Sequence, residues 1–423
     1  MPAIRSNRLL DHFNGRGAWT TLAEHRERFP KPPVGRSASL HLMELVAQAG
    51  LRGRGGAGFP TATKMRAVAA GRRRAIVVAN GSEGEPTSHK DATVMTHAPH
   101  LVLDGALVAA AAVGADEVIV GVVIHTGASR DALRRAAAER YRAEPASPRI
   151  RMVDVPSTYL AGEERALTHL INGGPPIPTS GPRPFEQGVG GRPTLIQNVE
   201  TLAHLALIYR GGAEAFRQTG SPETPGTMLV TISGGVGKPG VYEVSAGMAL
   251  TEVLRAAGGA PEGISAVLIG GYSGTWLTPS RAARVRLDHA DLAAEGAILG
   301  CASIVVLPDG GCVIRETAGV LHWLARQTAG QCGPCVHGLA AVSLATEQLQ
   351  TGQADARTLS RLAHWSDDIE GRGACRYPDG AIRLLRSALR SFESDAKSHQ
   401  AGAPCAGASR PSTLPLPAVP RPT

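Results

Sequence analysis

The sequence has few aromatic residues, since Phe, Trp and Tyr make up 4% of its 423 residues. Proteins that read nucleic acids usually combine clustered positive charge with aromatic rings that stack on bases. This chain carries 44 Lys and Arg against 36 Asp and Glu, but its Arg residues are scattered, and the one dense basic run is Arg72 to Arg74. The composition therefore argues against nucleic-acid binding.

Long apolar runs are also missing. The most apolar uncharged stretch, residues 297–308, is too short to span a bilayer, and residues 263–280 are interrupted by Gly, Ser and Thr. Residues 1–17 carry charges where a secretory signal has an apolar core. We therefore expect a cytoplasmic protein with no transmembrane segment.

Cysteine is scarce as well: the chain has six cysteines in 423 residues. So few cysteines in a chain of this length do not indicate a disulfide framework. Two of the six form the pair Cys332-Gly-Pro-Cys335, a spacing typical of metal or redox ligands. Taken alone, this pair could be a redox pair or half of a zinc site. The fourteen histidines show no HxxxH or HExxH spacing, so none is assigned to a metal.

Glycine, by contrast, is abundant, and the stretch GLRGRGGAGFPTATK (residues 50–64) is rich in it. Gly53, Gly55 and Gly58 match the G-x-G-x-x-G pattern of dinucleotide-binding folds, which requires a strand before the first glycine. Here residues 37–50 have apolar positions at helical spacing, so the glycines follow a helix. Glycine still lets the backbone approach an anion or a flat ring closely. We expect a phosphate-bearing ligand, bound outside the Rossmann pattern.

The next part of the chain alternates between apolar strands and helices. Strand patterns cover residues 75–80, 117–124 and 149–155, and helical patterns begin at residues 101 and 129. Strands separated by helices predict an α/β fold with a parallel sheet covered on both faces, whose ligands gather at the carboxyl ends of the strands. The segment NGSEGEP, residues 80–86, follows such an end.

The second half has a different organisation. Residues 173–194 are rich in Pro and Gly and predict a long loop, which in a compact domain is usually functional. Residues 227–277 predict a hairpin and a short helix in a small β-grasp-like module. From residue 316 onward the pattern is helical, and the last thirty or so residues, which include Cys405, lack apolar periodicity and predict a disordered tail.

Five motifs follow one another in a recognisable order. They are GLRGRGGAGFPTATK, NGSEGEPTSHKD, STYLAGEERALTHLING, GRPTLIQNVETLA and AGQCGPCVHG. Together they resemble the family of the NADH-binding flavoprotein subunit of respiratory NADH:quinone oxidoreductase, complex I, and the similar diaphorase subunits of NAD-dependent formate dehydrogenases and hydrogenases. The resemblance covers roughly residues 40–389.

The resemblance implies a fold with four parts. Residues 1–215 would form an FMN-binding α/β domain with a mainly parallel sheet and an N-terminal extension, and residues 216–310 a β-grasp-like soluble-ligand-binding domain. Residues 311–395 would form a helical bundle that carries an iron–sulfur cluster, followed by the disordered tail over residues 396–423.

The resemblance also implies the site residues. Those that would hold the phosphate, ring and ribityl chain of FMN are Gly53, Arg54, Gly55, Lys64, Asn80, Glu83, Gly162, Glu163, Glu164, Gln197, Asn198 and Thr201. Phe59 would be an aromatic contact of NADH, and Glu85 could bind a ribose hydroxyl. From the residues alone, the glutamates could also be solvated surface carboxylates. The cluster ligands would be Cys332, Cys335 and Cys375, and the third cysteine favours an iron–sulfur site over a redox pair or zinc.

The cluster motif departs from that of the family. The family has three cysteines spaced C-x-x-C-x-x-C and a fourth further along, whereas the first position is Ala329 here. Four thiolates are the usual ligand set of a [4Fe–4S] cluster. The expectation is therefore a cluster with an open or substituted corner, a three-iron cluster, or no cluster. Cys312 or His337 could substitute, although neither stands at the missing position.

The nicotinamide site departs too. Positions that carry aromatic rings or a lysine in the family are Ala67, Ser180 and Arg183 here, and Phe185 two residues further could replace the lost ring. Stacking contributes about 0.5 to 1.5 kcal/mol beyond burial, so two lost rings would weaken NADH binding while leaving the flavin site intact. In the flavin site, Ser82 replaces an aspartate of the family.

Three functions remain open at this point. The first is an FMN-dependent oxidoreductase subunit that takes a hydride from NADH and passes electrons through an iron–sulfur site to a partner protein. The second is a flavin-binding module of a redox assembly that has lost NADH oxidation and a complete cluster. The third uses Arg183, whose guanidinium suits the 2′-phosphate of NADPH or an acidic ferredoxin or flavodoxin partner. The expected partner is a thioredoxin-like [2Fe–2S] subunit or a ferredoxin-type acceptor, through which the chain could lie at the inner face of a membrane.

Overall fold

The computed structural model describes residues 8–10, 21–32, 39–124, 126–144 and 148–418. The chain divides into two compact units, each described by itself below. The first comprises Met1–Gly84, His89–Leu229 and Val241–Gly247, and the second comprises Glu85–Ser88, Val230–Gly240 and Met248–Thr423.

The first unit contains the parallel sheet that the sequence predicts. Its strands are β1 (Ile76–Gly81), β2 (Glu117–Val123), β3 (Arg149–Val155) and β4 (Thr194–Asn198), and their order across the sheet is β3-β2-β1-β4. Every neighbouring pair is parallel. The sheet thus brings the ends of β1 and β4 together, because the two strands lie side by side and run the same way.

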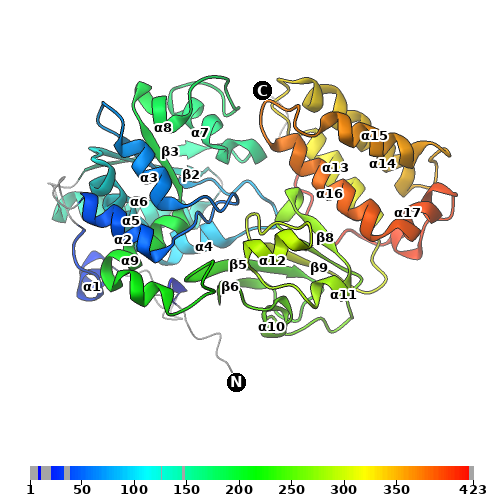
Figure 1. The fold of residues 1–423 in the computed structure, drawn as a ribbon, viewed down its shortest axis with the longest axis horizontal. Helices are drawn as coiled ribbons and strands as arrows, with labels where there is room; N and C mark the ends of the chain where they lie inside the picture. Colours follow the sequence, from blue (N-terminus) through cyan, green and yellow to red (C-terminus); the bar gives the residue numbers. More distant parts are fainter. Residues whose placement is uncertain (1–7, 11–20, 33–38, 125, 145–147, 419–423) are drawn as a thin grey trace. The chain divides into compact units, whose positions relative to one another are not determined.

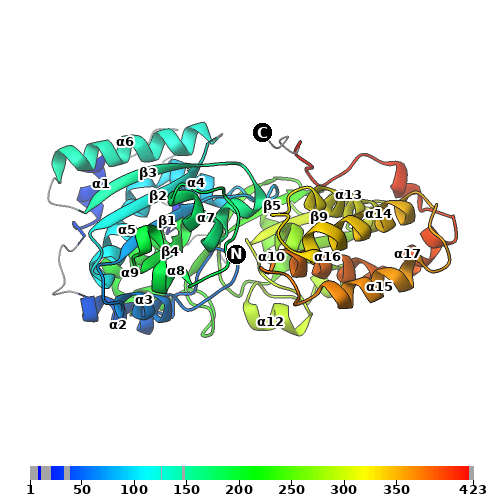
Figure 2. The same ribbon diagram turned by 90° about the horizontal axis from the view of Figure 1, so that it is seen from above.

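The helices of the first unit precede, connect and follow these strands. They are α1 (Leu22–Arg28), α2 (Ser39–Ala49), α3 (Thr61–Ala69), α4 (Lys90–His97), α5 (Pro99–Val113), α6 (Gly127–Ala143), α7 (Glu164–Ile171), α8 (Pro184–Gln187) and α9 (Val199–Arg217). Figures 1 and 2 show α5 and α9 packed beside the strands. The prediction of strands alternating with helices is confirmed for this unit.

Both faces of the sheet are covered, as the period-two alternation of strand side chains requires. Val77 and Ala79 belong to a large core that they share with α2, α5 and α9. Ile76 and Val78 point the other way, into a smaller core that includes Leu167 of α7. Helix α5 lies so close to α9 that a Cβ at Gly105 would meet the Leu202 carbonyl oxygen at 1.7 Å. Only glycine fits at this helix crossing.

A buried carboxyl group ties the N-terminal segment to the first unit. Oε2 of Glu243, which is 2% exposed, accepts hydrogen bonds from the backbone N–H groups of Leu9 and Leu10 at 2.9 and 3.0 Å. Its other oxygen accepts a hydrogen bond from the Thr227 hydroxyl. Burial raises the pKa of Glu243 to about 7, and the hydrogen bonds act in the opposite direction without cancelling that effect.

This raised pKa predicts a pH-dependent stability. A carboxyl whose pKa is higher in the folded than in the unfolded state stabilises the fold below the unfolded value and loses that contribution as the pH rises through 7. Glu243→Gln removes the titration, so from pH 4 to pH 8 the variant should gain roughly 3 kcal/mol of unfolding free energy relative to the wild type. Urea unfolding of both proteins at several pH values measures the difference, and a constant difference would contradict the raised pKa.

The second sheet is mixed. Its strands are β5 (Thr227–Gly234), β6 (Gly240–Ser245), β7 (Ala266–Ile269), β8 (Thr275–Leu277) and β9 (Ser303–Leu307), in the order β6-β5-β9-β7-β8. Strands β5 and β9 are parallel, whereas β7 is antiparallel to β8 and β9. Short helices α10 (Leu250–Ala256), α11 (Pro279–Ala282) and α12 (His289–Ala294) accompany it. This arrangement agrees with the β-grasp-like module expected from the sequence.

A helical region completes the second unit (Figure 1). Its elements are α13 (Val313–Ala325), the π-helical turn η6 (Pro334–Gly338), α14 (Leu339–Gln350), α15 (Thr358–Ile369), α16 (Tyr377–Ser391), α17 (Glu393–Gln400) and the 3₁₀ turn η7 (Ala406–Ser409). The fully buried Trp276 joins it to the sheet, since its indole N–H donates to Thr317 at 3.0 Å and its backbone N–H to Ser387 at 2.9 Å.

The C-terminal segment differs from the expected disordered tail. Residues 396–418 are described: residues 396–400 belong to α17, which contacts α14, α15 and α16, and the part from η7 onward docks on α13. The buried Glu316 carboxylate accepts hydrogen bonds from the Ser412 hydroxyl and from the backbone N–H groups of Thr413 and Leu414. The order therefore comes from polar contacts with a distant helix, which a search for local periodicity does not detect.

The described residues contain no single helix that is long and apolar enough to cross a membrane. The pair α4 and α5 reaches that length and composition together, but the two helices are bent by 97°.

Candidate functional site

The glycine-rich stretch forms a closed loop between α2 and α3. Gly53 N–H donates to the Phe59 carbonyl at 2.9 Å, and Thr61 N–H donates to the Leu51 carbonyl at 3.0 Å. Gly56 and Gly58 have φ angles of 119° and 61°, which side-chain-bearing residues rarely adopt. The loop follows a helix and leads into the helix that carries Lys64, so it is not a Rossmann turn.

Four segments that are distant in the sequence line one hollow in the first unit. It encloses about 510 Å³, part of which is open to solvent. Its lining residues are Gly53, Gly55, Ala57, Gly58, Phe59, Lys64, Asn80, Gly162, Glu164, Ile196, Gln197 and Asn198. Asn80 lies near the carboxyl end of β1, and Asn198 is the last residue of β4. The hollow therefore lies at the edge of the sheet where the topology predicts a ligand.

Lys64 supplies positive charge to the wall of the hollow. Its ammonium group forms an ion pair with Glu164 and donates to the Ile196 carbonyl at 2.6 Å. The Lys64 side chain is 18% exposed, whereas that of Glu164 is 45% exposed. A bound anion could thus replace the half-exposed carboxylate as the partner of a lysine that is already held in place.

Amide side chains at the strand ends are oriented by the fold. Asn80 Nδ2 donates to the Gly162 carbonyl at 2.9 Å, and Asn198 Nδ2 donates to the Asp91 carboxylate at 2.7 Å. Gln197 is 5% exposed, and its Nε2 has no hydrogen-bond partner among the described residues. A buried amide donor without a partner costs about 1 to 3 kcal/mol. Since Gln197 lines the hollow, a ligand there would relieve this cost.

Nine of the fourteen expected cofactor-binding residues lie on the lining of the hollow: Gly53, Gly55, Phe59, Lys64, Asn80, Gly162, Glu164, Gln197 and Asn198. Ala57, Gly58 and Ile196 also line it and were not among the expected residues. Gly58 belongs to the quoted glycine motif, but nothing in the sequence distinguishes Ala57 or Ile196 from ordinary loop and core residues.

The other five expected residues, Arg54, Glu83, Glu85, Glu163 and Thr201, do not line the hollow and make structural contacts instead. The Glu83 carboxylate accepts from the backbone N–H groups of Asp91 and Ala92 in the first turn of α4. Glu163 caps α7 by accepting from the backbone N–H groups of Arg165 and Ala166. The Thr201 hydroxyl accepts from the Arg54 backbone N–H at 2.8 Å, so Thr201 holds the glycine loop against α9.

The Arg54 side chain turns away from the hollow. Its guanidinium is buried and donates to the carbonyl oxygens of Pro225 and Thr227 at 3.3 and 3.0 Å. Burial lowers the pKa of Arg54, an effect that Glu200 partly opposes. Arg54 thus anchors the loop to the start of β5.

Glu85 lies in the second unit. One of its oxygens accepts from the Tyr272 backbone N–H at 2.8 Å and the other from the Thr87 hydroxyl at 2.8 Å. In the described arrangement this carboxylate holds the turn after Gly84 in place.

A buried group of charges supports the hollow, and no pattern in the sequence indicates it. The Lys90 ammonium, 2% exposed, lies 2.6 Å from Asp91 Oδ1 and 2.9 Å from Glu200 Oε2. Burial raises the pKa of Asp91 to about 7, although Lys90 acts in the opposite direction. For Glu200 burial also acts upward, but Lys90 and His204 outweigh it and bring the pKa to about 2. Asp91 then orients Asn198, so this group links the core to the lining.

The two aromatic residues expected near a nicotinamide, Phe59 and Phe185, have different surroundings. Phe59 lines the hollow and is 54% exposed, which leaves its ring available to a planar ligand. Phe185, expected as a replacement for the ring lost at Arg183, is not on the lining of the hollow and packs, partly buried, against the large core of the first unit. Arg183 instead precedes the short helix α8, where its backbone N–H donates to Glu186 at 3.0 Å.

The cysteines expected to bind a cluster lie together at the beginning of η6 and before α16. Burial acts to raise the pKa of Cys332, but the N–H groups of Ala374 and Cys335 and the Cys335 thiol outweigh it and lower that pKa. Burial raises the pKa of Cys335 to about 12, reinforced by the charges of Cys332 and Cys375. N–H donors around a cysteine sulfur stabilise the thiolate form that iron requires. Cys332 thus interacts with Cys335 and with the residue before Cys375, and the charge of Cys375 acts on Cys335, so the three expected ligands are neighbours.

Cys312 does not complete this set. It is the residue before α13, whereas Cys332 follows the end of that helix. A helix of 13 residues is about 20 Å long. The expectation that Cys312 could substitute for the missing cysteine is therefore not supported by its position.

Comparison with protein-family models gives three matches in chain order. The Nuo51 FMN-binding domain matches residues 46–207, the SLBB domain residues 229–270, and the NADH-ubiquinone oxidoreductase-F iron-sulfur binding region residues 315–399. The first match contains the hollow, and the third contains Cys332, Cys335 and Cys375.

Curated relatives and solved structures agree with these matches. One of the F subunits of NADH-quinone oxidoreductase from Rhizobium meliloti (strain 1021) is 33% identical over 376 residues, which are 85% of this chain and 88% of the relative. The F subunit of the same enzyme from Mycobacterium tuberculosis (strain ATCC 25618 / H37Rv) is 32% identical, covering 86% and 85%. A chain of an NAD+-reducing [NiFe]-hydrogenase in the H2-reduced state is 30% identical with a TM-score of 0.78, covering 90% of this chain and 67% of that one. With its FMN-binding and iron–sulfur regions in the same order along most of the length of these relatives, the chain belongs to the family of NADH-quinone oxidoreductase F subunits, which are flavoproteins.

Proposed function

We propose that the hollow of the first unit holds FMN, that the flavin takes a hydride from NADH, and that its electrons leave through an iron–sulfur site at Cys332, Cys335 and Cys375. The observation that carries the proposal is the convergence of the glycine loop, Lys64 and the ends of β1 and β4 on one hollow. The buried, unpartnered Nε2 of Gln197 is an independent sign that a ligand with acceptor atoms belongs there.

Different residues of the lining would bind different parts of FMN. Lys64 would pair with the phosphate, because its contacts with the Ile196 carbonyl and the Glu164 carboxylate hold its ammonium group at the wall of the hollow. Gly53 and Gly55 allow the flavin to approach the main chain, since a Cβ at Gly55 would lie 3.3 Å from Cβ of Asn198 and narrow the hollow. Asn80 and Gln197 would orient the flavin by hydrogen bonds to its polar edge.

FMN, when bound, supplies two-electron acceptance and one-electron release, which couples a nicotinamide to iron–sulfur carriers. The chain's own residues bind and orient it. The exposed ring of Phe59 would contact the nicotinamide or adenine of NADH. An iron–sulfur protein would receive the electrons, with a thioredoxin-like [2Fe–2S] subunit or a ferredoxin-type protein as the proposed partner and the cytoplasmic face of a membrane as the proposed location.

The proposal is tested by cofactor content and by reduction kinetics. The purified chain should contain FMN or take it up to about one per chain, and rapid mixing with NADH should bleach the flavin absorbance. Failure to bind FMN would overturn the proposal. A bound flavin that NADH does not reduce would support the second candidate, a flavin module without NADH oxidation, which is motivated by Ala67 and by the burial of Phe185 against the core. Faster reduction by NADPH would show that Arg183 selects a 2′-phosphate.

Replacing Lys64 by methionine should weaken FMN binding by ~10- to 100-fold, because a hydrogen bond to a charged group contributes about 1.5 to 3 kcal/mol. Fluorescence titration of the flavin-free protein with FMN measures the change. Riboflavin, which has no phosphate, should bind both proteins equally. The matched control is Lys397→Met, which removes a lysine paired to Glu393 on the surface of α17 and should leave FMN affinity unchanged.

A further inference from the structure

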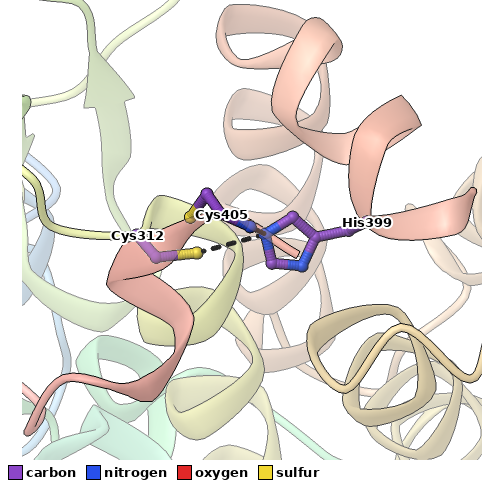
Figure 3. A group of neighbouring side chains, drawn as sticks. All are labelled: Cys312, His399 and Cys405. Carbon is purple, nitrogen blue, oxygen red and sulfur yellow. Dashed lines mark hydrogen bonds between the residues drawn. The ribbon is translucent and has the colours of Figure 1, made fainter. Parts of the chain in front are cut away.

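Three metal-ligating side chains converge in the helical region, away from the cysteines of the cluster site. Cys312 precedes α13, His399 lies in the last turn of α17, and Cys405 precedes η7 (Figure 3). Their two sulfur atoms and one imidazole nitrogen all lie within 4.8 Å of one another. Within the described residues, no other group of His, Cys, Asp or Glu side chains meets in this way. No motif in the sequence indicates this group of three ligands, because Cys312 is distant in the sequence from His399 and Cys405.

The distance between Cys312 and His399 matches an edge of a tetrahedral site. With Zn–S bonds of about 2.3 Å and Zn–N bonds of about 2.05 Å, the S···N edge of a tetrahedron is about 3.6 Å and the S···S edge about 3.8 Å. Cys312 Sγ lies 3.5 Å from His399 Nε2. The other two separations lie below 4.8 Å, so the three ligand atoms are close enough to surround one ion.

The surroundings orient the three ligands. His399 is fully buried, and its Nδ1 lies 3.2 Å from the Leu349 carbonyl at the end of α14. An Nδ1–H that donates to a carbonyl leaves the Nε2 lone pair pointing at the two sulfurs, as in metal-binding histidines. The Arg315 N–H donates to Cys312 Sγ at 3.4 Å, which helps to hold the sulfur in position at the start of α13.

We propose that Cys312, His399 and Cys405 form a site for one thiophilic divalent cation of the zinc class. Two thiolates and a neutral imidazole suit Zn²⁺ better than the hard cations Mg²⁺ and Ca²⁺. Binding of the ion releases the two thiol protons. His399 Nε2 gives up the hydrogen bond that it accepts from the Cys405 backbone N–H at 3.3 Å and binds the ion instead. Water takes the fourth position from the side of Cys405, which is partly exposed.

The ion would act as a clamp on the C-terminal segment. It would join Cys405 to α13 and α17 in addition to the hydrogen bonds that Glu316 makes to the same segment. This role is independent of flavin and of the cluster, since none of the three ligands belongs to either site.

The test uses the full chain, purified under reducing conditions, with Zn²⁺ alone as the probe and gel filtration to remove the excess. Cys405→Ala should bind about one zinc fewer per chain than the wild type, and chelator competition should show affinity at this site reduced by more than ~100-fold, since even outer-shell changes cost 10- to 100-fold. The matched control, Cys301→Ala, should bind as much zinc as the wild type. Any zinc held by Cys332, Cys335 and Cys375 is the same in the wild type and the two variants, so it does not affect the difference in zinc content between them.

Cys405→Asp separates ligation from folding, because a carboxylate also binds zinc. It should restore the lost zinc at lower affinity, whereas a merely structural role for Cys405 predicts no rescue. Equal zinc content in Cys405→Ala and the wild type would overturn the proposal. A disulfide between Cys312 and Cys405 that forms in the presence of zinc, with no zinc bound, would also overturn it. Mass spectrometry of the non-reduced chain detects that disulfide.

Discussion

Replacing Lys90 by methionine is expected to lower the free energy of unfolding by about 3 to 5 kcal/mol. The Lys90 ammonium lies between the carboxylates of Asp91 and Glu200, at 2.6 and 2.9 Å, and all three side chains are almost fully buried. Breaking a buried ion pair by removing one partner costs this much because it leaves charge without compensation in a medium of low polarity. Methionine keeps the length and the apolar stem, so the loss reports on the charge.

The measurement is denaturant unfolding followed by a signal from the first unit. Lys397→Met is the matched control, since Lys397 also pairs with a glutamate at 2.6 Å but is 67% exposed, and such pairs contribute less than about 0.5 kcal/mol. Because Asp91 orients Asn198, Lys90→Met should weaken FMN binding as well. A loss below about 1 kcal/mol would mean that the two carboxylates are protonated or hydrated without the lysine.

Ala329→Cys is expected to convert an incomplete cluster into a complete one. The wild type places three cysteines together, and the position of the first cysteine of the family motif is Ala329, a partly exposed residue between α13 and η6. An iron without a cysteine ligand is held more weakly, since Cys₄ is the usual set for [4Fe–4S]. After anaerobic reconstitution and brief exposure to air, the wild type should retain about three irons per chain and Ala329→Cys about four.

Iron and sulfide analysis, with electron paramagnetic resonance of the oxidised proteins, distinguishes the two clusters. Ala340→Cys is the control, because it adds an exposed thiol in α14 away from the missing position and should leave the iron content unchanged. Four irons per wild-type chain that survive air would show that a ligand other than cysteine completes the set. No iron in either protein would support the candidate function without a cluster.

Much of the fold followed from the sequence, because the signals that define it are local. Apolar strand patterns separated by helical patterns predicted a parallel sheet covered on both faces, and the side chains of β1 indeed enter two cores, Val77 on one face and Ile76 and Val78 on the other. The glycine loop, Lys64, Asn80 and Gln197 were identified by motif. The three last residues and several glycines of the loop line the hollow.

What the sequence did not reveal depends on contacts between distant residues. Arg54 is part of the most recognisable motif, yet its guanidinium hydrogen-bonds to the carbonyl of Thr227, 173 residues away. Lys90 and Glu200 meet in the core from two different helices, α4 and α9. The docking of the C-terminal segment on Glu316 likewise needs the position of α13. No local periodicity encodes such pairs, since each residue alone has the pattern of a solvated surface charge or a loop.

The wall formed by Gly53, Gly55 and Gly58 has no side-chain atoms, and this limits what mutagenesis can detect. A scan that truncates side chains to alanine leaves nothing to remove at these positions, so it would assign the whole recognition of a ligand to Lys64 and its polar neighbours. The contribution of the peptide backbone becomes measurable only when atoms are added. At this wall the absence of side chains determines which ligand shapes fit. A list of functional side chains therefore underestimates how much the wall contributes to ligand recognition.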